Sequence, residues 1–192
     1  MLRRSSVVGG AESLSPRRKW RAIMLATLLL VPAYWSLLVG LVSVASDESR
    51  GSPYAGPYIA FGLGLIPFVF VALAFLSQHP RAPAAAAKAM VLALVVGIPV
   101  SAVAADAVTG FVAGIGAGGA LAMRVDLDRS WKARALAVMV VSAWAFVTVR
   151  VMPEAVLLLA PILPFTSVGV ADHLLEIRRD RRATPHLPTG RG

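Results

Sequence analysis

The chain has 192 residues, of which 57% are hydrophobic and only 15% are charged, and its formal net charge is +9. Soluble domains carry about 25% charged residues, so this composition excludes an ordinary soluble fold. The lack of Cys excludes disulfides, thiolate metal sites and cysteine nucleophiles. Membrane proteins keep Lys and Arg on their cytoplasmic side, so a basic balance is expected without any nucleic-acid partner.

The chain begins with a basic segment that precedes a long apolar run. Residues 1–19 contain five Arg and Lys residues among Gly, Ser and Pro, which predicts a flexible cytoplasmic tail. No charge occurs from Ala22 to Ala45. This run would form about 36 Å of helix, enough for a hydrocarbon core of about 30 Å. It is also longer than a signal-peptide core of about 7–15 residues, so we predict a first transmembrane helix over 22–45.

A second apolar run, 58–77, predicts a second transmembrane helix. It is separated from the first by a polar segment rich in Gly, Ser and Pro, which is typical of an exposed loop. The connection that follows, 78–88, holds Arg81 and Lys88, although its alanines at 84–87 fit a helix equally well.

The passage from Ala89 to Met123 contains one charged residue, Asp106. A single helix of this length would exceed 50 Å by about 1.5 Å per residue, too long for one crossing. We therefore predict two helices, 89–105 and 107–123, with Asp106 at the tip of a hairpin. A re-entrant hairpin, which enters and leaves on one side, is the alternative, but it would draw the Asp106 carboxylate into the membrane.

The remaining apolar runs predict a fifth helix over 135–149 and a sixth over 155–171. We expect the sixth helix to continue beyond the membrane, so that the transmembrane domain covers 20–177. Residues 178–192 form a basic cytoplasmic tail, predicted to be disordered after about residue 183.

The basic residues decide the orientation. With six crossings, seventeen of the nineteen Lys and Arg residues fall on one face, and only Arg50 and Arg150 fall on the other. The sequence thus predicts an all-α bundle of six transmembrane helices with both termini in the cytoplasm. Arg outnumbers Lys sixteen to three, and the chain is rich in Ala, Val and Leu. This usage resembles that of GC-rich bacterial genes and indicates a multi-pass protein of the bacterial cytoplasmic (inner) membrane.

Three groups of residues are candidates for function. Small residues at four-residue spacing predict one narrow helix face that packs against another helix, within the chain or in a partner. Two prolines with nearby hydroxyls predict a broken helix beside a cavity. Clustered arginines in the C-terminal tail predict contacts with anionic lipid headgroups. The small-residue face comprises Gly110, Gly114, Gly118 and Ala122. The broken-helix group comprises Pro161, Pro164, Thr166 and Ser167. The arginine cluster comprises Arg178, Arg179, Arg181 and Arg182.

No pattern predicts a catalytic, cofactor or metal site. Asp126 and Asp128 have the spacing of a metal–phosphate site, but they lack the further carboxylates that membrane lipid-transferring enzymes use. We expect a non-enzymatic accessory or scaffold subunit that acts through helix–helix association, with the bilayer and another membrane protein or a second copy as partners. A small permease or transporter subunit for a small or lipid-like solute is the alternative, and a lipid-modifying enzyme is the third hypothesis.

Overall fold

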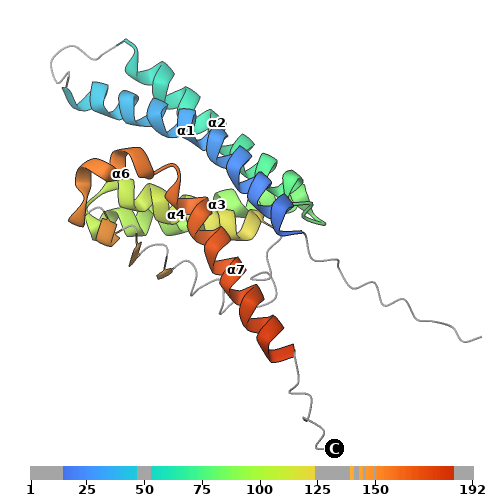
Figure 1. Cartoon of the computed structure of the whole chain (residues 1–192). Coiled ribbons are helices and arrows are strands. Elements are labelled where there is room, and N and C mark those ends of the chain that lie inside the picture. The colour runs from blue at the N-terminus through green and yellow to red at the C-terminus, as the bar shows by residue number, and fades with distance from the viewer. Residues whose placement is uncertain are drawn as a thin grey trace, which may run out of the picture.

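The computed structural model describes residues 15–46, 53–123 and 150–183, and residues 139–140, 143–144 and 146–148 between them. These residues form helices and turns, and no strand occurs among them. Figure 1 shows the arrangement of the helices. In chain order they are α1 (Pro16–Ser46), α2 (Ala55–Leu76), α3 (Ala82–Ala104), α4 (Ala107–Ala122), α6 (Pro153–Leu159) and α7 (Leu163–Ala183).

Three of these helices, α1, α2 and α3, are long and apolar enough to cross a membrane, and α4 is a shorter apolar helix of 16 residues. The predicted all-helical class is therefore confirmed, and three membrane-spanning candidates support a membrane protein. Most of the predicted helix 135–149 lies outside the described residues, as do the N-terminal residues 1–14 and the C-terminal residues 184–192.

The first two helices form an antiparallel hairpin whose backbones approach closely at glycines. A Cβ atom on Gly62 of α2 would lie 2.7 Å from the carbonyl oxygen of Ala33 in α1. Near the other end of the contact, a Cβ on Gly40 would lie 3.1 Å from the carbonyl oxygen of Ala55. No side chain fits at either position without displacing the neighbouring helix, so glycine sets the distance between the two helices.

Residues 89–123 are divided between two helices, as the sequence predicts. The chain reverses at Ala105, whose φ of 51° and ψ of 34° place it in the left-handed region, and α4 starts directly after Asp106. Gly110 of α4 lies against Ser101 of α3, and Gly118 lies against the Ala89 carbonyl, so α3 and α4 are antiparallel.

The two hairpins pack tightly in one half of the molecule and diverge in the other (Figure 1). The tight half holds the start of α1, the α2–α3 connection and the end of α4. Its core joins side chains of these helices and of α7, among them Ile23, Leu30, Phe70, Leu73 and Phe165. The α3–α4 connection lies at the opposite end, and α7 runs from that side back past α4 and α1.

Several helices start earlier than the sequence predicts. Helix α1 starts at Pro16, so residues 16–19 belong to a helix and not to the predicted tail; the amide groups of Arg18 and Lys19 donate to the Ser15 carbonyl. Proline suits the first turn of a helix, and Lys and Arg are good helix formers. Helix α3 likewise includes the alanines at 84–87 and starts at Ala82.

The predicted sixth helix, 155–171, is two helices in the structure. Helix α6 ends at Leu159, a turn covers 160–162, and α7 begins at Leu163. Pro161 and Pro164 both lack an amide hydrogen, so the i to i−4 hydrogen-bond ladder cannot continue through this stretch. Helix α7 extends to Ala183, which agrees with the expectation that the last helix continues beyond the apolar run.

Candidate functional site

A buried ion pair joins the two ends of the described chain. The Lys19 ammonium of α1 lies 2.8 Å from a carboxylate oxygen of Asp172 in α7, and the side chains are 9% and 2% exposed. Trp20 beside Lys19 packs near Gly169, one turn before Asp172. The sequence predicts that Lys19 belongs to the N-terminal cytoplasmic tail, and it predicts no ion pair for Asp172. A separation of 153 residues hides this partnership from any local pattern.

The Asp106 carboxylate caps the start of α4. It accepts hydrogen bonds from the amide of Val108 at 3.2 Å and from the amide of Thr109 at 2.7 Å, and also from the Thr109 hydroxyl. An acidic N-cap satisfies amides that have no partner within the helix, and its charge is favourable at the helix N-terminus. The only charge in the 89–123 passage thus has a structural role at the hairpin tip.

The predicted helix face of Gly110, Gly114, Gly118 and Ala122 is buried inside the chain. A Cβ atom on Gly114 would lie 2.4 Å from the Ala93 carbonyl oxygen of α3. A Cβ on Gly118 would lie 2.6 Å from both the Ala89 carbonyl oxygen and the Phe70 ring. Of the two partners that the sequence allowed, the structure places a helix of the same chain on this face.

The broken-helix residues lie at the α6–α7 turn. Pro161 and Pro164 are buried, and the Thr166 hydroxyl in α7 donates at 2.7 Å to the carbonyl of Ile162, in the turn directly before this helix. The apolar groove of the molecule is lined by residues of α1, α2, α3 and α4. A role for Pro161, Pro164, Thr166 and Ser167 beside a cavity therefore stays a prediction. The backbone of α7 includes Arg178, Arg179, Arg181 and Arg182, whose side chains lie outside the described part of the structure.

A groove opens between the diverging hairpins. Its volume is about 410 Å³, and it lies between α2 and α3 with α4 behind. Every lining side chain is apolar except the hydroxyl-bearing Ser101, in the last turn of α3. The rim consists of side chains that are largely exposed: Leu63 at 55%, Leu94 at 62% and Ile98 at 66%. The residues that line it are Leu37, Leu63, Ile66, Pro67, Phe70, Met90, Ala93, Leu94, Gly97, Ile98, Ser101, Ala107, Gly110, Phe111, Gly114 and Ile115.

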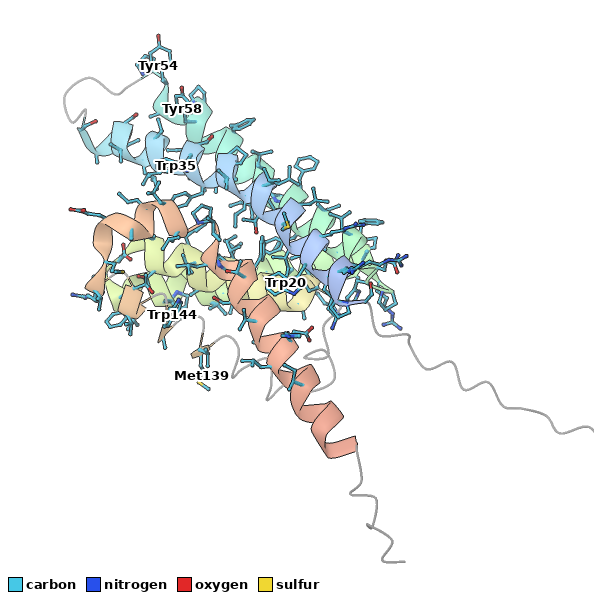
Figure 2. All side chains as sticks on the ribbon, viewed as in Figure 1. Trp20, Trp35, Tyr54, Tyr58, Met139 and Trp144 are labelled. Atoms are coloured by element: carbon cyan, nitrogen blue, oxygen red, sulfur yellow. The ribbon has the colours of Figure 1, made fainter. Side chains whose placement is uncertain are left out.

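The opposite side of α2 carries an exposed aromatic stripe, defined here as Tyr54, Phe61, Phe68 and Phe75. These side chains follow one another at seven-residue spacing and are 69%, 56%, 65% and 57% exposed. Tyr58, 45% exposed, lies beside the stripe. Figure 2 shows Tyr54 and Tyr58 at the start of α2, pointing away from the other helices. The stripe is not among the residue groups predicted above, although its heptad spacing is visible in the sequence.

The described residues contain no group of three or more His, Asp or Glu side chains placed to hold a metal ion. Asp126 and Asp128 fall outside these residues. No family model, curated protein or solved structure matches the chain. Its class therefore rests on the fold itself: an all-helical protein with three apolar helices of membrane-spanning length, a groove between two hairpins, and an aromatic stripe on α2.

Proposed function

We propose that this protein is a non-enzymatic accessory or scaffold subunit of the bacterial inner membrane, which acts by helix–helix association. The observation that carries the proposal is the aromatic stripe on α2. Residues at seven-residue spacing drift by about 20° per heptad around a straight helix. When two helices supercoil around each other, such a repeat stays in contact with the neighbouring helix. The partner is a transmembrane helix, in another membrane protein or in a second copy of this chain.

Two carboxylates of the described helices have structural partners, which supports the proposal of a structural role. The Asp172 carboxylate pairs with Lys19, and the Asp106 carboxylate caps α4. The glycine face of α4 is covered by α3, so the association surface that we propose is the aromatic stripe on the outer side of α2. Six crossings with both termini in the cytoplasm belong to the same proposal. The position of Arg17, Arg81 and Lys88 toward one end of the bundle supports it.

Substitution within the stripe tests the proposal directly. Phe61→Leu with Phe68→Leu preserves hydrophobicity but removes the rings, so insertion should be retained while association is lost. Cross-linking in native membranes followed by native gels should show the complex for the unaltered chain and a fall of about tenfold in its yield for the double variant. Phe146→Leu is the matched control, because Phe146 is 43% exposed and lies outside the stripe. Equal complex yields for all three proteins would rule the stripe out as the association surface.

A second candidate is a permease or transporter subunit for a lipid-like solute. The apolar groove, with Pro67 of α2 in its lining, favours a lipid-like solute over a polar one. Movement of a fluorescent lipid between leaflets of proteoliposomes, compared with protein-free vesicles, tests this candidate. A rate equal to that of the protein-free vesicles would reject it.

A further inference from the structure

We propose that the groove between the two hairpins is a binding site for one acyl chain of a membrane lipid. The proposal does not rest on the α2 aromatic stripe, which lies on the other side of α2 from the groove. It rests on the polarity, the volume and the length of the groove.

Water cannot fill the groove stably. A bound water needs two to four polar partners, and Ser101 supplies the only hydroxyl among the described lining residues. An empty groove would leave its walls without dispersion contacts on one side. The exposed rim residues Leu63, Leu94 and Ile98 face outward from candidate spans, toward the lipid surroundings. Hydrocarbon is therefore the occupant that matches both the lining and the medium.

The volume of the groove agrees with one acyl chain and is too small to enclose a whole helix. A helix about 10 Å across that rises 1.5 Å per residue occupies roughly 120 Å³ per residue. The volume of about 410 Å³ thus equals only a few residues of helix. A methylene group is similar in size to a water molecule, whose share of the liquid is about 30 Å³, so the groove holds roughly a dozen methylene groups. This is the size of one lipid tail.

The length of the groove agrees with one leaflet. Along α3 the lining extends from Met90 to Ser101, about 16 Å of helix, which is about half of a hydrocarbon core of about 30 Å. The Ser101 end lies next to the α3–α4 connection, where Asp106 begins α4. The lipid headgroup should therefore lie at this connection, and the tail should end near Met90 in the middle of the bundle.

Glycine makes the back wall deep. Gly97, Gly110 and Gly114 let α3 and α4 approach so closely that the Cβ of an alanine at Gly110 would lie 2.6 Å from the Gly97 carbonyl oxygen. The wall between the two helices consequently has no side chains at these positions. Phe111 and Ile115 flank it and supply the apolar contact surface.

The test uses the full chain in phosphatidylethanolamine and phosphatidylglycerol vesicles that contain a phospholipid with a diazirine in the middle of one acyl chain. After irradiation, mass spectrometry compares label on residues 90–101 with label on the lipid-facing side of α1 at Leu25 and Leu28, which are 48% and 65% exposed. A bound tail should enrich the label on α3 by about tenfold over the α1 surface. Equal labelling of the two surfaces would overturn the proposal, as would cross-links from the groove to another polypeptide.

Groove-filling variants give the second arm of the test. Ala93→Phe places a ring in the groove and should abolish the enrichment of the label. Ala102→Phe is the control, because it places the same ring on the exposed side of α3, outside the groove lining, and should preserve the enrichment. Ala107→Phe blocks the mouth from the exposed first turn of α4, and it serves if Ala93→Phe does not fold. Enrichment that survives Ala107→Phe or a folded Ala93→Phe would also overturn the proposal.

Discussion

At the scale of single residues, two carboxylates of the described helices, those of Asp106 and Asp172, are held by specific partners. The Lys19–Asp172 pair is the buried example, with both side chains nearly removed from solvent. A buried pair is not in itself a large source of stability, because both charges lose their hydration. Its effect is in specificity, since an unpaired Asp172 or Lys19 at this position would be costly. The pair therefore fixes where α7 crosses α1.

Removing one partner of this pair should destabilise the protein more than removing both. Asp172→Asn removes the carboxylate that pairs with the buried Lys19 ammonium and should lower the free energy of unfolding by about 3–5 kcal/mol. Lys19→Met combined with Asp172→Leu replaces the pair by apolar groups and should restore most of that loss. Thermal unfolding in detergent, followed by circular dichroism for Lys19→Met, for Asp172→Leu and for the double variant that combines them, measures the coupling. Strictly additive losses would show that the two charges do not stabilise each other.

At the scale of elements, close helix packing depends on glycines that face a backbone. Gly114→Ala should lower the free energy of unfolding by at least about 1–3 kcal/mol, because its Cβ would lie 2.4 Å from the Ala93 carbonyl oxygen. Gly64→Ala in α2 is the matched control, since a Cβ there meets nothing within 4 Å. It should be neutral or gain up to about 1 kcal/mol from helix propensity. Chemical denaturation in detergent compares the two variants, and similar midpoints would contradict the role of glycine in the α3–α4 contact.

Much of this packing is local enough to be read from the sequence. The four-residue spacing of Gly110, Gly114 and Gly118 predicts a packed face, and the length of 89–123 with Asp106 near its middle predicts the two helices of the hairpin. Pro161 and Pro164 likewise predict an interruption of the last apolar helix. These signals act within a few residues or follow from membrane thickness, so no tertiary information is needed.

The contacts that the sequence could not supply are those between distant elements. The choice of α3 as the partner of the glycine face, the pairing of Lys19 with Asp172, and the groove all depend on how the hairpins are placed relative to each other. The early start of α1 could not be predicted for the same reason. Basic residues before an apolar run resemble a solvated tail, and only the buried partner on α7 shows that Lys19 belongs inside the helical bundle.

At the scale of the whole molecule, the polar connections between helices are divided between two ends. Six described basic residues, Arg17, Arg18, Lys19, Arg21, Arg81 and Lys88, lie at the start of α1, in the α2–α3 connection or at the start of α3, whereas Asp106 and Arg150 lie toward the opposite end. Membrane insertion retains Lys and Arg in the cytoplasm, so the basic end is expected to face it. Helix α1, with 31 residues and about 46 Å of length, is longer than a hydrocarbon core of about 30 Å.

Accessibility of single cysteines tests this orientation and the path of α3 and α4 together, because the chain has no Cys of its own. Pro53→Cys before α2 and Ala107→Cys at the start of α4 are exposed positions at one end, and Pro80→Cys is exposed at the other. A membrane-impermeant maleimide added to intact cells should label the first two, and it should label Pro80→Cys only after permeabilisation. Labelling of Pro53→Cys without Ala107→Cys would instead support a re-entrant α3–α4 hairpin. Labelling of Pro80→Cys in intact cells would show that the orientation is the reverse of the proposed one. Arg81 and Lys88 would then lie outside the cytoplasm, against the preference of Lys and Arg for the cytoplasmic side.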